Sequence, residues 1–196
     1  MDPAYRRALW LVIGLNGAMF ILEMLAGAWS GSKSLQADAL DFLGDFLTYS
    51  LSFIAIGWTP PARARAALFK GTTLILLAIY VFGSTLYQVL MPTPPEPFTM
   101  GIVAMMAFGA NLLSVLLLIR WRAGDANIRS VWLCSRNDML ANIAVLIAAM
   151  GVFGTGTAWP DLIVATLMAG LFLHSARLII QHSIIELRGQ CHHQPV

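Results

Sequence analysis

Between residues 35 and 58 the chain reads LQADALDFLGDFLTYSLSFIAIGW, an apolar stretch long enough to cross a bilayer that nevertheless contains three aspartates. Asp38, Asp41 and Asp45 fall at positions i, i+3 and i+7. On an α-helix this spacing places the three carboxyl groups on one face, within roughly 60° of one another. An ionised carboxylate near the middle of a membrane helix costs about 2.5 to 3.5 kcal/mol on insertion scales. We therefore expect these side chains to face a cavity, a partner or a cation rather than lipid.

The composition indicates an integral membrane protein, with 58% hydrophobic residues, 11% charged residues and a mean hydropathy of +0.73. A hydrocarbon core of about 30 Å requires roughly 20 helical residues, and six apolar runs of that length use most of the chain. We expect an all-α membrane protein that forms a single domain over residues 1–196. The predicted spans are 8–28, 35–58, 71–91, 98–119, 131–153 and 159–180.

The basic residues predict the orientation of these spans. Arginines and lysines precede the first span, fill the connections between spans two and three and between spans four and five, and follow span six, whereas the opposite connections contain only Lys33. Positive connections stay in the cytoplasm, so we expect both termini there and a multi-pass protein of a bacterial inner membrane. The net charge of +2 reflects this bias and gives no indication of nucleic-acid binding.

A second polar pair lies in the fifth span, where Cys134 and Asp138 are four residues apart. This spacing repeats that of Asp41 and Asp45, and each pair occupies one helical face. Two helices that each present such a pair can supply four ligands to one divalent ion, the number that tetrahedral zinc prefers. Because spans two and five run antiparallel, we expect Asp41 to lie opposite Asp138, and Asp45 opposite Cys134. Packing as a small buried hydrophobic side chain is the alternative for Cys134.

Four further polar residues are candidates for the ion pathway or for support of the ligands: Asp38, Asn142, Glu23 and Asn16. Asp38 lies near the outer end of its span, where capping of the helix is an equally good explanation. Asn142 falls one turn beyond Asp138, and a hydrogen bond between helices is the main alternative to a ligand role. Glu23 and Asn16 share a face of the first span at i, i+7, where they line the pathway or hold a neighbouring helix.

The chain resembles the cation diffusion facilitators, a family of six-helix exporters of zinc and related divalent metals. The resemblance covers nearly the whole sequence, and its most specific element is the four-residue spacing repeated on spans two and five. The matching segments are Ser30-Gly31-Ser32, the stretch 35–45, Asn127-Ile128-Arg129, Asp138, and Gly156, Trp159 and Asp161 before span six.

This resemblance implies that Asp41, Asp45, Cys134 and Asp138 form an intramembrane transport site, where metal moves outward against protons that move inward. Many zinc transporters of the family have His/Asp where this chain has Asp/Asp, and a histidine where it has Cys134. Zinc is the leading substrate, with cadmium, cobalt, iron and manganese as alternatives. The cation is a substrate, and no cofactor is expected.

The resemblance also bears on assembly. The chain stops about where the family's cytosolic C-terminal domain begins, so we expect a short form without that domain. A homodimer would then be held by membrane helices, and Gly14 and Ala18, four residues apart on the first span, allow close approach.

Two other functions were compared with metal export. A membrane phosphatidyltransferase also uses an Asp-x-x-Asp segment, but its signature has a glycine after the second aspartate and an Ala-Arg pair, whereas here Phe42 follows Asp41 and the helix has no such pair. A transporter of non-metal small molecules would not need two matched polar pairs in mid-membrane. We therefore expect a transporter and no enzyme.

Overall fold

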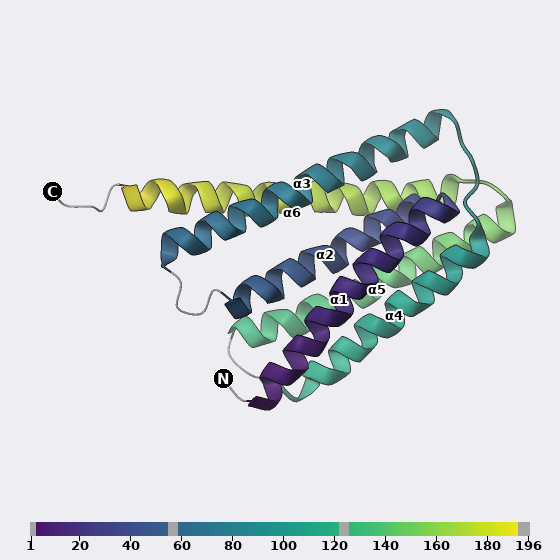
Figure 1. Ribbon diagram of the computed structural model, residues 1–196. Helices are drawn as coiled ribbons and strands as arrows, with labels where there is room; N and C mark the ends of the chain where they lie inside the picture. Colours follow the sequence, from purple (N-terminus) through teal and green to yellow (C-terminus); the bar gives the residue numbers. More distant parts are fainter. Residues whose placement is uncertain (1–2, 55–58, 122–125, 192–196) are drawn as a thin grey trace.

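The computed structural model describes residues 3–54, 59–121 and 126–191, in which the chain forms six long helices and one short 3₁₀ turn (Figure 1). The helices are α1 (Pro3–Ser30), α2 (Lys33–Ile54), α3 (Pro60–Leu90), α4 (Pro97–Leu118), α5 (Ala126–Thr155) and α6 (Trp159–Cys191), and the turn is Ile119–Trp121. The described residues contain no strand, which confirms the predicted all-α class.

Five of the six helices are long and apolar enough to cross a membrane, judged by length and composition over the described residues. The exception is α2, which contains Lys33 and the three aspartates. Its 22 residues still span about 33 Å at 1.5 Å per residue, which matches a hydrocarbon core. The protein is therefore an all-α, multi-pass integral membrane protein.

Several helices extend beyond the predicted spans. α3 begins at Pro60, well before residue 71, α5 begins at Ala126, and α6 continues to Cys191, past residue 180. The apolar runs mark only the part of a helix in contact with hydrocarbon, whereas backbone hydrogen bonds continue through the polar turns beyond it. Pro60 and Pro61 occupy the first turn of α3, where a missing amide hydrogen costs nothing. Residues 55–58, predicted as the end of the second span, lie outside the described residues.

The helices form two groups. α1, α2, α4 and α5 pack side by side in a ring, while α3 and α6 pack along each other and against α2 and α5 (Figure 1). We call the end of the molecule with both chain termini the terminal face, and the end with the connections 31–32, 91–96 and 156–158 the loop face.

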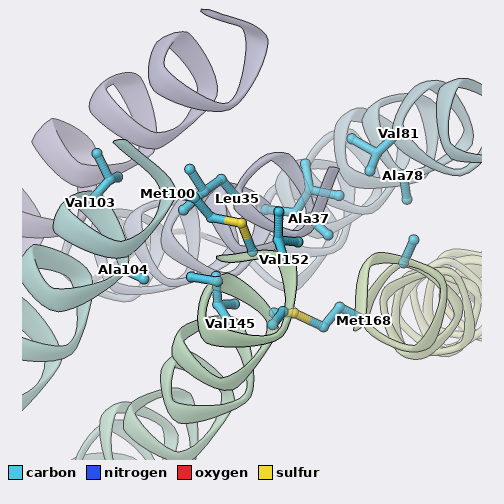
Figure 2. Packing of buried hydrophobic residues seen from close by; sticks show 14 residues of the cluster. Leu35, Ala37, Ala78, Val81, Met100, Val103, Ala104, Val145, Val152 and Met168 are labelled. Atoms are coloured by element: carbon cyan, nitrogen blue, oxygen red, sulfur yellow. The ribbon is translucent and has the colours of Figure 1, made fainter. Parts of the chain in front are cut away.

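A buried apolar cluster joins five helices in the half of the molecule nearer the loop face. Met100 of α4 reaches toward Leu35 of α2 and Val152 of α5, and Val81 of α3 completes one side (Figure 2). Small side chains in this cluster permit close approach of the helix backbones, as is usual in membrane proteins. They are Ala37, Ala78, Ala104, Ala148, Ala149 and Ala169.

Asp161, in the first turn of α6, holds the start of α2 by hydrogen bonds. Its Oδ1 accepts from the Ser32 hydroxyl at 2.7 Å, the Ser34 hydroxyl at 2.6 Å and the Ser34 amide at 3.1 Å, and its Oδ2 accepts from the Lys33 amide at 2.8 Å. Helix N-terminal amides have no partner within the helix and favour a negative charge. The buried Asp161 therefore caps a helix distant in sequence and fastens the α3–α6 pair to the ring at the loop face.

Replacing Asp161 by alanine should lower the free energy of unfolding by about 2 kcal/mol or more, because it removes a cap and leaves buried donors unpaired. The measurement is denaturant or thermal unfolding in detergent micelles. Glu96→Ala is the matched control, since Glu96 caps α4 through the Phe98 and Thr99 amides at an exposed position. An equal loss of stability in the two variants would contradict the role assigned to the buried cap.

Candidate metal site

A cavity of about 280 Å³ lies between α2, α3, α5 and α6, toward the terminal face. Asp41 and Asp45 line it from α2, and Asp138 lines it from α5. The remaining wall is largely apolar, with side chains such as Leu74, Met168 and Phe172. Two carboxyl groups of α2 and one of α5 thus line one cavity.

The three carboxyl groups interact with one another. Asp138 interacts electrostatically with both Asp41 and Asp45 and lies within hydrogen-bonding reach of Asp45. The Tyr49 hydroxyl, one turn along α2, donates a hydrogen bond to Asp45 Oδ2. Asp45 is thereby oriented by its own helix, and its position does not depend on a bound ion alone.

Lys70 also lines this cavity, from the terminal-face end of α3. Its ammonium group donates a hydrogen bond to the hydroxyl of Thr48, another lining residue. With all groups ionised, the described residues that line the cavity contribute three carboxylates and one ammonium, and so carry two negative charges. A single divalent cation would balance that charge.

Sequence reasoning missed Lys70, Thr48 and Tyr49 as parts of this site. Lys70 was interpreted only as one of the basic residues that set orientation, because the third span was predicted to begin at residue 71. Tyr49 lies four residues after Asp45, one turn further along the acidic face of α2, and this spacing was a usable signal.

In the described part of the chain, no three histidine, cysteine or acidic side chains converge closely enough to hold a metal ion. The side chain of Cys134, the fourth predicted ligand, lies outside the described residues, although its backbone belongs to α5. The predicted opposition of Asp45 and Cys134 therefore stays a prediction.

The other four predicted polar residues are buried and do not line the cavity. Asn16 donates to the Val12 carbonyl at 2.8 Å, within α1. Asn142 donates to the Asp138 carbonyl at 2.7 Å, within α5, and so stiffens the turn that carries a cavity carboxylate. Glu23 and Asp38 have no exposed surface.

The chain is similar to known membrane proteins over most of its length. The family model described as the cation efflux transmembrane domain matches residues 9–187. The chain is 27% identical over 190 residues to the metal cation efflux system protein CzcD of Cupriavidus metallidurans, covering 91% of this chain and 60% of that protein. It is 27% identical over 199 residues to the zinc transporter ZitB of Escherichia coli, covering 95% and 63%.

A third relative is the cadmium, cobalt and zinc/H(+)-K(+) antiporter of Bacillus subtilis, 26% identical over 202 residues and covering 93% of this chain and 63% of that protein. The chain thus spans less than two thirds of the length of these relatives.

The position of the cavity predicts one-sided access. A cysteine introduced at Ser175, which is exposed and lines the cavity, should react with a membrane-impermeant maleimide in inverted vesicles and not in intact cells. The reason is that the apolar cluster closes the loop-face half, and the terminal face is expected to be cytoplasmic. The measurement is labelling above that of the parent protein, which has its own two cysteines.

Ala107→Cys serves as the control for this experiment, because Ala107 has no exposed surface in a separate apolar cluster. It should stay unlabelled from both sides. Labelling of Ser175→Cys only in intact cells would contradict either the orientation or the direction in which the cavity opens.

Proposed function

Because the chain belongs to the cation efflux transmembrane domain family, we propose that it moves divalent metal ions out of the cytoplasm by alternating access. The observation that carries the proposal is the convergence of Asp41, Asp45 and Asp138 from α2 and α5 on one cavity between helices that cross the membrane. Charged side chains at this depth are costly unless they face a cavity and a counter-ion.

The proposed ligands are Asp41, Asp45, Asp138 and Cys134, one helical pair from each of α2 and α5. The several negative charges of these ligands favour a divalent over a monovalent cation. Because no three of the described carboxyl groups converge closely enough to hold an ion, ion binding would draw α2 and α5 together around the metal. Lys70 would stay at the terminal-face side, where its charge limits how many cations the cavity accepts at once.

The proposed substrate is zinc. A set of carboxylates with one thiolate suits zinc and cadmium, whereas carboxylates and water alone would suit manganese. The relatives are named for zinc, or for cadmium, cobalt and zinc, which supports the same group of metals. Transport assays should therefore also test cobalt, iron and manganese.

The arrangement of helices supports a rocking movement. The loop-face half is closed by the apolar cluster and by the Asp161 cap, while the cavity lies in the other half between the ring and the α3–α6 pair. Movement of that pair against α2 and α5 would open the loop face and close the terminal face. The metal would then leave on the side opposite to its entry.

We place both termini in the cytoplasm and the protein in a bacterial inner membrane, as the basic residues predict. A homodimer through membrane helices is part of the proposal, and Gly14 and Ala18 lie on the exposed side of α1. The phosphatidyltransferase alternative finds no support in the family comparison. A transporter should bind metal in detergent without any nucleotide-lipid substrate.

Replacing Asp45 or Asp138 singly by alanine should reduce zinc uptake into inverted vesicles at least about tenfold, because each change removes a ligand. The protein should still fold and insert, since each change also removes an insertion cost. Ser175→Ala, at the same cavity but without a carboxylate, should transport normally. Full transport by Asp45→Ala at limiting zinc would refute the site.

Transport should be coupled to protons, because metal binds deprotonated ligands and so releases their protons on binding. Zinc uptake into inverted vesicles should accelerate when the lumen is made acidic, and the lumen should become more alkaline as zinc enters. A lumenal pH dye and a zinc dye record the two changes together. If the rate of zinc uptake does not change with an imposed pH gradient, and the lumenal pH does not change during uptake, facilitated diffusion would be indicated instead.

A further inference from the structure

Glu23 of α1 and Asp38 of α2 form a second pair of carboxyl groups, apart from the cavity. Both side chains have no exposed surface, and neither lines the cavity. They lie close enough to interact electrostatically with each other. None of their four carboxyl oxygens has a hydrogen-bond partner outside the pair among the described residues. Buried polar groups in proteins are nearly always satisfied, so four oxygens without such a partner at one place require an explanation.

The pair is closed toward the loop face by tight contact between α1 and α2. A Cβ atom at Gly27, one turn beyond Glu23, would lie 2.9 Å from Gln36 Cγ and 3.1 Å from the Gln36 amide nitrogen. Only a glycine fits there without movement of the Gln36 backbone. The helices therefore touch directly beside the pair, which leaves no room for water from that side.

Toward the terminal face, the pair is closed by apolar side chains. Met19 lies one turn before Glu23, Phe42 lies one turn after Asp38, and the two belong to one buried cluster with Ala107 of α4. Because the pair is enclosed at both ends, its charge cannot be balanced by surrounding water. Two ionised carboxylates in such a place would repel each other and lack hydration, so a positive charge has to accompany them.

The charged groups near the pair do not supply that positive charge. Glu23 interacts electrostatically with Asp38 and Asp41, and Asp138 of α5 interacts electrostatically with Asp38. All of these neighbours are acidic. Helix α4, which packs against α1, contains no titratable residue. The Lys33 ammonium, at the start of α2, donates instead to Gln36 Oε1 at 3.4 Å.

We propose that Glu23 and Asp38 form a second, oxygen-only cation-binding position next to the metal cavity. It would hold a small cation, either a proton or a metal ion, since both bind carboxylate oxygens. Asp41 links the two places: it lines the cavity and also interacts with Asp38. Metal binding at Asp41 would thus change the affinity of the Glu23–Asp38 pair for its cation. This proposal rests on the proposed transport function, because the second cation position would exchange charge with the metal cavity.

Calorimetric titration of purified protein with zinc, in buffers of different ionisation enthalpy, yields both the number of metal ions bound and the protons released. The variants are Glu23→Gln and Asp38→Asn, which keep the shape of each side chain and remove its charge. The control is Ser114→Ala, a buried polar residue of α4 whose hydroxyl donates to the Ala110 carbonyl at 3.0 Å. It should leave both quantities unchanged.

If the pair holds a metal ion, wild-type protein binds an additional zinc ion that both variants lose. If it holds a proton, the number of bound zinc ions stays the same and the variants release about one proton fewer per chain. Variants that match wild type in both quantities would overturn the proposal. So would metal-free wild-type protein that shows no protonated carboxyl group by infrared spectroscopy at neutral pH and binds a single zinc ion.

Asp138→Ala separates this proposal from the transport function. If it binds zinc as wild type does, the cavity assignment fails. If it binds zinc weakly while Glu23→Gln and Asp38→Asn behave as wild type, only the second cation position fails.

Discussion

The structure depends on one constraint: a carboxylate placed among membrane helices must find donors, a cation or a proton. Five acidic side chains face this constraint inside the helices, and Asp161 faces it at their loop-face ends. Asp161 is satisfied by four hydrogen bonds, and it holds helices in place. Asp45 is satisfied in part, by Tyr49. Glu23 and Asp38 are not satisfied by any described protein group outside their pair. A carboxylate that receives fewer hydrogen bonds from the protein depends more on a bound cation or proton.

This division of the acidic residues coincides with a division of the molecule into two halves. The loop-face half combines the Asp161 cap, a hydrogen bond of 2.9 Å from the Glu96 amide to the Ser30 carbonyl, and the apolar cluster around Met100. The terminal-face half contains the cavity, where the α3–α6 pair and the ring are separated by a space of about 280 Å³. A protein built to open at alternate faces needs this kind of asymmetry in any single state, because opening both faces at once would leak.

Much of this architecture follows from the sequence. The apolar runs predict the helices, and helical periodicity with antiparallel packing predicts that the polar faces of α2 and α5 are turned toward each other. The four-ligand set Asp41, Asp45, Cys134 and Asp138 stays a prediction. The ends of α3 and α6 do not follow, since polar helical turns outside the hydrocarbon resemble connections in composition. The Asp161 cap does not follow either, since it joins residues that are more than a hundred positions apart. Lys70 does not follow from the sequence as a cavity residue, because it lies in such a polar helical turn.

In the proposed transport cycle, the charge of the cavity also bears on how the protein would reset after releasing a metal ion. Among the described lining residues, three ionised carboxylates and the Lys70 ammonium carry two negative charges, which a divalent ion would neutralise on binding. An emptied cavity that kept those charges would have to carry them through a low-dielectric interior during the return movement, at a cost similar to that of an unpaired buried ion. Two positive charges taken up from the other side would remove that cost. The same residues that select a divalent cation therefore also favour an exchange, in which the loaded and the returning forms carry nearly equal charge.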